Sequence, residues 1–186
     1  GNILYRTACA SCRKCVPIRI PVESFQPSRS QRRALGRNQD VRMLVHEPEL
    51  TAEKHDVYKR YLRAQHAQSP QGEDLESMRE FLYSSCVATV EIEYRDPRDK
   101  LLAVSICDVS KRSISSVYHF FDPDEHRRSL GVYSVLKEIE LCREKKINWY
   151  YLGYWIEGCP TMDYKRQYQP HELLIEGEWT PGETPK

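Results

Sequence analysis

The chain has 186 residues, of which 40% are hydrophobic and 30% are charged, and its formal net charge is +1. That balance is typical of a folded domain with a core and excludes a disordered tail. No apolar run approaches the ~20 residues of a membrane-spanning helix, so we expect no membrane partner. The chain opens on Gly1 rather than Met, without a recognisable signal peptide, and we interpret it as a fragment that lacks an N-terminal segment.

The first half of the chain predicts two strands and three helices. Residues 16–25 form an extended segment whose prolines favour the edge of a sheet. Ser28 or Ser30 is a suitable N-cap for a short helix that ends near Arg37. The other expected elements are a strand at 41–46, a helix from Thr51 to about His66, and a helix whose apolar stripe includes Leu75, Met78, Phe81 and Leu82.

The second half gives clearer signals. Residues 88–95 alternate apolar and polar side chains with a period of two, which predicts a half-buried strand. Further strands are expected at 101–109, 114–121, 148–155 and 171–176, and helices at 129–145 and 162–168. The segment 148–155 has few charged residues, so we expect it near the centre of the sheet.

Three antiparallel strands followed by a helix and another strand are the order found in acyl-CoA N-acetyltransferases. A strand followed by a helix and a neighbouring strand places a ligand at the helix N-terminus. We therefore predict an α/β (α+β) fold of the acetyltransferase (GNAT) type, with a mixed, mainly antiparallel sheet flanked by helices. By analogy of architecture alone, this fold suggests acyl transfer to an amine.

Seven cysteines, an odd number, are distributed along the chain. Their scattered placement and the lack of a secretion signal predict a reducing, cytoplasmic location. Cys9, Cys12 and Cys15 are spaced like ligands of zinc or an iron–sulfur cluster. Three thiolates are one fewer than a closed structural site needs, so a loop of reduced cysteines is an equally good interpretation.

Basic residues concentrate between positions 13 and 42, where eight arginines and lysines face only Glu23 and Asp40. Within this stretch, Phe-Gln-Pro-Ser-Arg-Ser-Gln-Arg-Arg (25–33) combines arginines with hydroxyl and amide side chains at the start of a helix. Such a group can hold phosphate or carboxylate. A solvated basic helix explains the composition equally well.

A second motif, Arg-Arg-Ser-Leu-Gly-Val-Tyr (127–133), opens the long helix. Acetyltransferases place small residues here so that backbone amides reach the pyrophosphate of CoA. Arg128 and Gly131 fit that pattern, whereas Tyr133 replaces a small residue. An aromatic ring there should obstruct CoA, and it could instead stack on a base. The alternative is a helix start with a packed tyrosine.

The third motif, Tyr-Leu-Gly-Tyr-Trp-Ile-Glu-Gly-Cys-Pro-Thr-Met-Asp-Tyr-Lys (151–165), joins an aromatic strand to a short helix. A cation beside aromatic rings can hold a carboxylate in a partly dry pocket. The simpler interpretation is an aromatic core strand with surface bases.

In combination, these motifs and two others resemble one family. The others are Cys-x-x-Cys-Arg-x-Cys-Val-Pro-x-Arg-Ile (9–20) and Phe-Phe-Asp-Pro-Asp-Glu (120–125). The chain is similar to the bacterial aspartate/glutamate leucyltransferases, relatives of the eukaryotic arginyl-tRNA–protein transferases. The resemblance extends from about Leu4 to Leu174.

The resemblance implies transfer of an amino acid from aminoacyl-tRNA to proteins with N-terminal Asp or Glu, in the N-degron pathway of degradation. The cysteine pattern and the compact insert between Leu50 and Tyr83 look bacterial, which favours leucine over arginine as donor. The resemblance also implies that residues 1–25 are the end of a cysteine-bearing subdomain and that residues 26–186 form the transferase domain. Zinc or an iron–sulfur cluster is expected only in that subdomain of the complete protein, and the transfer itself should need no cofactor.

The resemblance and the motifs together suggest three groups of site residues. Those expected at the tRNA or its aminoacyl end are Arg29, Ser30, Gln31, Arg32, Arg33, Arg128, Gly131 and Tyr133. Those expected at the acidic acceptor are Tyr154, Tyr164 and Lys165. His119 or Asp122 could assist proton transfer, although Asp122 before Pro123 is also a good helix N-cap.

The sequence is also compatible with two other functions. An acetyl-CoA-dependent N-acetyltransferase would share the fold, and Tyr133 is the residue that argues against it. A non-catalytic RNA-binding module could be built on the cysteine loop and the basic helix. Binding without turnover would distinguish this module from an enzyme.

Overall fold

A computed structural model of the chain describes residues 9, 11–65 and 72–182. Within them the strands are β1 (Val16–Pro21), β2 (Arg42–His46), β3 (Thr89–Arg95), β4 (Leu101–Val109), β5 (Ser113–Phe121), β6 (Trp149–Trp155), β7 (Glu172–Ile175) and β8 (Glu178–Pro181). The α-helices are α1 (Arg29–Arg37), α2 (Ala52–Gln65), α3 (Leu75–Met78) and α4 (Leu130–Glu144). A π-helical turn (Arg79–Tyr83) and 3₁₀ turns at Pro123–Arg128 and Asp163–Gln167 complete the regular structure.

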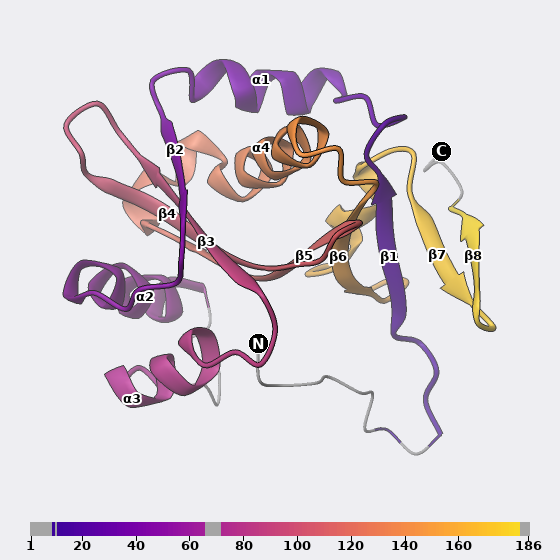
Figure 1. The fold of residues 1–186 in the computed structure, drawn as a ribbon, viewed down its shortest axis with the longest axis horizontal. Coiled ribbons are helices and arrows are strands. Elements are labelled where there is room, and N and C mark those ends of the chain that lie inside the picture. Colours follow the sequence, from indigo (N-terminus) through magenta and orange to yellow (C-terminus); the bar gives the residue numbers. More distant parts are fainter. Residues whose placement is uncertain (1–8, 10, 66–71, 183–186) are drawn as a thin grey trace.

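The described strands form one sheet in the order β2-β3-β4-β5-β6-β1-β7-β8. Neighbouring strands are antiparallel except β5 and β6, which are parallel. Figure 1 shows α1 and α4 on one face of the sheet and α2 and α3 on the other. This mixed, mainly antiparallel sheet with helices on both faces confirms the predicted fold class.

Each face of the sheet has its own apolar core. On one face, α4 packs on the sheet through residues such as Leu136 and Ile139, which belong to the same buried cluster as Ile18 and Tyr150. On the other face, α2 and α3 cover the sheet in a second cluster that includes Phe120. Among the described residues, no helix is long and apolar enough to cross a membrane.

Several local predictions are confirmed in detail. Ser28 caps α1 with a complete capping box, in which its hydroxyl accepts from the backbone N–H of Gln31 and the Gln31 side chain accepts from the N–H of Ser28. The Thr51 hydroxyl accepts a hydrogen bond from the N–H of Lys54 at the start of α2. Strand β6 lies inside the sheet, as its low charge indicates.

The expected edge position of residues 16–25 is wrong, because β1 lies between β6 and β7. Within β1, only Ile18 and Arg19 pair with β7. Pro17 and Pro21 lie outside this short ladder, so their missing N–H groups remove no hydrogen bond from it. The division of the chain at residue 25 stays a prediction. Strand β1, from the first part, pairs with two strands of the second.

Strand β8 was not expected from the sequence. It forms a hairpin with β7 through Glu176 and Gly177, which both have positive φ angles (51° and 90°). Two consecutive positive φ values are typical of the tight turns that connect hairpin strands. The dipeptide Glu-Gly is a weaker sequence signal for such a turn than Asn-Gly or Asp-Gly.

The parallel strands β5 and β6 separate soon after they pair, and this separation creates the site described below. Their pairing covers only Ser113–Ser115 against Trp149–Tyr151. Each strand also shifts register against its other neighbour nearby, which leaves Val117 of β5 and Leu152 of β6 as extra, bulged residues. The bulges bend the two strands apart at the N-terminus of α4.

Candidate functional site

A cavity of about 510 Å³ lies where β5 and β6 separate, and we call it the fork pocket. Its lining comprises Tyr61, Gln65, Ser116, Val117, Tyr118, His119, Phe121, His126, Ser129, Leu130, Gly131, Val132, Ser134, Val135, Leu152, Tyr164, Lys165 and Tyr168. Most of these side chains are aromatic or aliphatic, and none is Asp or Glu. The fork pocket is therefore an apolar cavity with a few polar groups, the usual character of a ligand site.

Lys165 is the cation of the fork pocket. Its ammonium donates a hydrogen bond to the backbone carbonyl of Tyr154 at 2.6 Å, and no carboxylate of the described residues forms an ion pair with it. Burial lowers the pKa of Lys165. A half-buried ammonium without a counterion has free capacity for an anion, because its two other N–H donors remain available.

His119 and Tyr168 bring two buried polar atoms to the same pocket. The Nδ1 of His119 lies 2.9 Å from the Ser105 hydroxyl, whereas its buried Nε2 has no partner among the described residues. Burial lowers the pKa of His119 to about 4, so the ring is neutral near pH 7. The hydroxyl of Tyr168 is likewise buried without a partner there. Unpaired buried polar atoms at a cavity are costly unless a ligand or water meets them.

The N-terminus of α4 opens into the fork pocket. Ser129, the residue before the helix, has a left-handed backbone (φ 56°, ψ 50°), and its side chain makes no capping hydrogen bond. Gly131, in the first turn, lines the cavity, and a β-carbon there would lie 3.9 Å from the His119 ring. A helix N-terminus without a side-chain cap can offer its N–H groups to negative charge in the cavity.

Helix α1 presents an arginine face beside this pocket, formed by Arg29, Arg32, Arg33 and Arg37. These four residues, with Ser30 and Gly36, line a hollow of about 770 Å³. A smaller hollow of about 180 Å³ shares Ser30 and Arg37 with the hollow of the arginine face, and Ser129, Val132, Tyr164 and Tyr168 with the fork pocket. The three hollows therefore adjoin through shared lining residues, and we refer to them together as the depression.

The arginines of this face differ in how far they are engaged. Arg29 and Arg33 are exposed and form no ion pair with any described residue. Arg32 donates to the carbonyl of Pro27 at 2.6 Å, and Arg37 donates to the carbonyl of Arg127 at 3.1 Å. No described carboxylate neutralises these four side chains, so the face carries a strong positive charge.

Gln31, Arg128 and Tyr133 have structural partners where the sequence suggests contacts with RNA. Gln31 is buried, and its side chain donates to the carbonyl of Gln167 as well as capping α1. Arg128 forms a bidentate pair with Asp40 at 2.9 and 3.0 Å and a third bond to Glu125. Tyr133 is 4% exposed and packs against Tyr94 in the core. Of the three, only Gln31 lines one of the hollows, and Arg128 and Tyr133 line none of them.

Asp122 and Tyr154 also lie outside the lining of the fork pocket. Asp122 caps the 3₁₀ turn that follows β5 by accepting from the N–H of Asp124, as Asp-Pro predicts. It pairs with Arg60 and Lys100, and although burial raises its pKa, these hydrogen bonds lower it overall. Tyr154 supplies the carbonyl that orients Lys165. The geometry thus places His119, Tyr164 and Lys165 together and leaves Asp122 in a supporting position.

The cysteine loop does not form a metal centre in the described residues. Cys9 and Cys12 are exposed, Cys15 is half-buried, and the three thiols do not gather into a set of close ligand atoms. The residues present therefore do not fit zinc or an iron–sulfur cluster by themselves.

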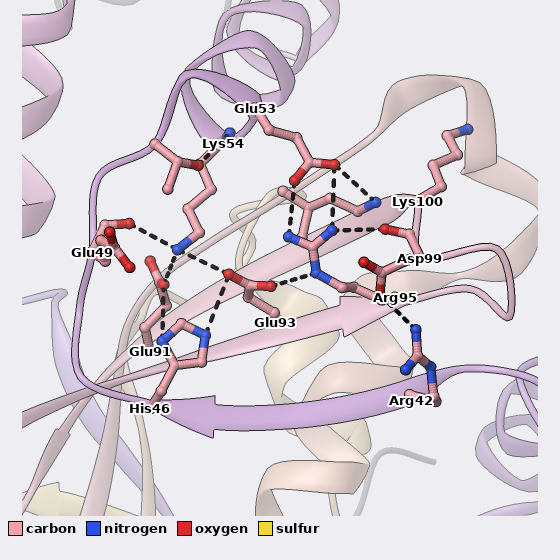
Figure 2. A network of polar contacts seen from close by, with 12 residues as sticks. Arg42, His46, Glu49, Glu53, Lys54, Glu91, Glu93, Arg95, Asp99 and Lys100 are labelled. Carbon is pink, nitrogen blue, oxygen red and sulfur yellow. Dashed lines mark hydrogen bonds and ion pairs between the residues drawn. The ribbon is translucent and has the colours of Figure 1, made fainter.

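The only close group of three potential metal ligands among the described residues is His46, Glu91 and Glu93. Figure 2 shows that the ammonium of Lys54 already lies between the two carboxylates. This lysine supplies the positive charge that a cation would bring, so the group is a compensated structural network.

Sequence reasoning missed Tyr168, Arg37 and the tyrosines of β5 and α2 that line the fork pocket. Tyr168 and Arg37 follow motifs that were recognised, 151–165 and 25–33, by only a few residues. The aromatic residues Tyr61 and Tyr118 read as ordinary core positions on a helix and a strand. Only the separation of β5 from β6 turns those positions into a cavity wall.

Two family models match the chain. The model described as the C terminus of arginine-tRNA-protein transferase matches residues 53–175, and the model of its N terminus matches residues 1–33. The chain belongs to the arginine-tRNA-protein transferase family. The C-terminal match contains β5, α4, β6 and Lys165, and the N-terminal match reaches the arginine face.

Curated relatives of this transferase family share a more specific name. An aspartate/glutamate leucyltransferase of Saccharophagus degradans is 41% identical over 96% of the chain and 76% of its own length. An Acinetobacter baumannii protein of the same name is 42% identical over 96% of the chain. The chain spans 66% of the length of that second relative.

Solved structures show the same fold at low sequence identity. L-PGS from Bacillus licheniformis matches with a TM-score of 0.62 at 11% identity, over 90% of the chain and 58% of that structure. A GCN5-related glucosamine N-acetyltransferase region of a fungal enzyme matches with a TM-score of 0.54 at 10% identity, over 90% of the chain and 20% of that structure. These likenesses show an acetyltransferase-like fold for the chain.

Proposed function

We propose that this chain transfers leucine from aminoacyl-tRNA to the α-amino group of proteins whose first residue is Asp or Glu, and that the reaction takes place in the fork pocket. Relatives about 40% identical carry the name aspartate/glutamate leucyltransferase. The reaction belongs in the cytoplasm, where charged tRNA is found and where the chain's free cysteines stay reduced. Addition of leucine would mark the acceptor for degradation by the N-degron pathway.

The observation that carries the proposal is the unpaired ammonium of Lys165 in an apolar cavity. An N-terminal Asp or Glu supplies the carboxylate that Lys165 lacks, and the surrounding aromatic side chains strengthen the pair by excluding water. An acceptor that begins with Asn or Gln offers only a neutral amide. Preference for acidic acceptors follows from this difference.

The walls of the fork pocket favour leucine over arginine as the donor side chain. Val117, Leu130, Val135 and Leu152 provide an aliphatic lining, and no carboxylate lines the pocket to pair with a guanidinium. Enclosing an unpaired arginine side chain there would leave its charge without compensation, which is unfavourable. A leucyl group needs only apolar contacts.

The arginine face of α1 is suited to the phosphates of the tRNA acceptor end. Its four arginines are not neutralised by described carboxylates, and the depression continues from them to the fork pocket. Arginine recognises phosphate well because its planar guanidinium donates in pairs. The acceptor end can therefore lie along α1 with the aminoacyl ester at the mouth of α4.

Within the pocket, positioning accounts for much of the chemistry. The ester is already activated, and an α-amino group titrates near 8, so a useful fraction is neutral at cytoplasmic pH. The uncapped N-terminus of α4 can stabilise negative charge that develops on the ester carbonyl oxygen. Holding amine and ester in contact supplies a further large rate factor.

A matched set of substrates tests the proposal. The complete protein is mixed with leucyl-tRNA or arginyl-tRNA and with peptides that differ only in beginning with Asp or Asn, and products are followed by mass spectrometry. We expect leucine on the Asp peptide and little on the Asn peptide. Transfer of arginine alone would overturn the donor assignment, and acetylation from acetyl-CoA in a parallel sample, without aminoacyl transfer, would overturn the reaction.

A further inference from the structure

A chain of buried polar groups begins at the fork pocket and leads into the core. Ser105 of β4 lies directly opposite His119 of β5 in the sheet and is 0% exposed. Its hydroxyl is 2.9 Å from Nδ1 of His119. On its other side, the hydroxyl contacts the carboxyl group of Glu138 on α4. His119 is therefore connected to a buried carboxyl group through one hydroxyl.

Glu138 is an unusual core residue, because it is 1% exposed and no basic side chain of the described residues pairs with it. Neutral donors surround it instead. The Tyr94 hydroxyl donates to it at 3.1 Å, the Tyr150 hydroxyl donates to the other oxygen, and the Cys107 thiol lies 3.6 Å away. Burial raises the pKa of Glu138, while these donors partly oppose that effect. Glu138 is therefore a buried titratable group whose hydrogen-bond partners are all neutral donors.

Stability alone does not explain this arrangement. A buried carboxyl group usually costs stability, and apolar side chains of similar size would fill the space without that cost. A purely structural network would also leave no reason for Nε2 of His119 to lie buried and unpartnered at the cavity. The polar chain has one end at the pocket and its other end at a group that can hold a proton.

We propose that His119, Ser105 and Glu138 form a proton relay for aminoacyl transfer, an inference that rests on the proposed function. His119 is the catalytic residue, because its ring lines the fork pocket and its Nε2 has no hydrogen-bond partner among the described residues. Ser105 and Glu138 are positioning residues, which fix the tautomer with hydrogen on Nδ1 and stabilise the imidazolium that forms. The neutral ring expected near pH 7 is the form that can accept a proton.

The reaction balances as one proton moved from nitrogen to oxygen. The acceptor's neutral α-amine attacks the ester carbonyl carbon, and a C–N bond forms. The nitrogen, now cationic, gives one proton to Nε2 of His119. As the C–O ester bond breaks, the ribose oxygen of the tRNA terminus takes this proton from Nε2. The products are an amide and a free ribose hydroxyl, and the imidazole returns to its neutral form.

Chemical rescue tests the catalytic role of His119. We expect His119→Ala to lower kcat for transfer from leucyl-tRNA to the Asp peptide about 100-fold, within the range for general acid–base groups. Added imidazoles should restore part of kcat, and substituted imidazoles of higher pKa should restore more. A residue that only packs would give no dependence on the pKa of the added base. His119→Asn, which keeps a partner for Ser105, should lose kcat as well.

A pair of hydroxyl deletions tests the positioning role. Ser105→Ala disconnects His119 from Glu138, so we expect kcat to fall about tenfold with little change in KM. Tyr150→Phe removes another hydroxyl from Glu138 but leaves the link to His119 intact, so it should retain most of kcat. Equal losses in the two variants would contradict the relay.

The two proposals can fail separately. If the wild-type chain transfers no amino acid, the proposed function fails and the relay with it. If the wild type transfers leucine and both His119 variants keep full kcat, only the relay is wrong. Circular dichroism of each variant shows whether it folds. If His119→Ala does not fold, the comparison of Ser105→Ala with its control Tyr150→Phe still tests the relay.

Discussion

Two lysines of this molecule, the buried Lys54 and the half-buried Lys165, have opposite surroundings. The ammonium of Lys54, on α2, lies between Glu91 and Glu93 of β3 and also donates to the carbonyl of Glu49 at 2.7 Å (Figure 2). Tyr83 donates a hydrogen bond to Glu91, Arg95 pairs with Glu93, and the His46 ring lies 3.5 Å from Glu91 and 3.3 Å from Glu93. Lys165, at the fork pocket, has one backbone carbonyl and no described carboxylate.

The difference separates structural charge from functional charge. Burying a charge is costly unless it is paired, and the Lys54 network is paired on all sides by side chains from three elements. Lys165 is half-buried with one backbone carbonyl and no described carboxylate, so the free energy that its burial costs is recovered only when an anion binds. A cation without a counterion at a cavity is therefore a better indicator of a site than the burial of a cation as such.

The largest expected effect concerns the compensated lysine. Lys54→Met leaves the buried Glu91 carboxylate without its lysine and removes one of the two cations that hold Glu93, so the free energy of unfolding should fall by about 3–5 kcal/mol. Urea unfolding followed by circular dichroism measures the loss. The double variant Lys54→Met with Glu91→Gln should recover part of the loss, since it removes the carboxylate that Lys54 neutralised. A loss below about 1 kcal/mol in the single variant would contradict the claim that Lys54 neutralises these buried carboxylates.

Acid should destabilise the fold through His119. Its pKa is about 4 in the folded chain, against an ordinary value of 6.5, so the unfolded state binds the extra proton between these values. The free energy of unfolding should fall by up to about 3 kcal/mol as pH drops from 6.5 to 4. His119→Asn cannot take up this proton, so the difference in stability between wild type and variant should shrink over that range. A difference independent of pH would contradict the assignment.

The arginine face should control how tRNA binding depends on salt. Replacing Arg29 and Arg33 by Ala removes two unpaired cations, so the slope of log affinity against log salt should become shallower by about 0.8 per arginine. Filter binding or fluorescence anisotropy over a salt series measures that slope. Unchanged slopes would place the RNA elsewhere.

Arg128 provides the matched control and the smallest effect. Because Asp40 and Glu125 already hold its guanidinium, Arg128→Ala should leave the salt slope nearly unchanged and lower stability by about 1 kcal/mol or less. Thermal unfolding and the same binding series measure both quantities. A slope change equal to that of Arg29 would mean that the Asp40 pair opens to bind RNA.

Local signals in the sequence predicted the fold well, whereas distant contacts decided the site. The capping box at Ser28 and the alternation in β3 depend on neighbours along the chain, so they were readable. The pairing of Arg128 with Asp40 joins residues 88 positions apart, so no local sequence pattern predicts it. Tyr133 shows the same limit, because its packing on Tyr94 depends on how α4 lies against the sheet.

Lys165 was recognised for its motif, but its decisive property is the absence of a described counterion, which only the structure reveals. The same holds for His119. Its position in a β-strand predicts nothing special, and its role follows from Ser105 and Glu138, which lie on two other elements. Whether a cation has a counterion depends on tertiary contacts. Sequence patterns therefore identify candidate cations but do not show which of them are paired with a carboxylate.

The ratio of kcat/KM for peptides beginning with Asp and with Asn, measured in wild type and in Lys165→Met, tests the central claim most directly. We predict that the wild type prefers Asp by roughly 10- to 100-fold, and that the variant loses this preference while it binds leucyl-tRNA as before. Lys137→Met, which removes a lysine paired with Glu140, should keep the preference. A Lys165→Met protein that still discriminates Asp from Asn, or that loses tRNA binding and acceptor use equally, would contradict the account.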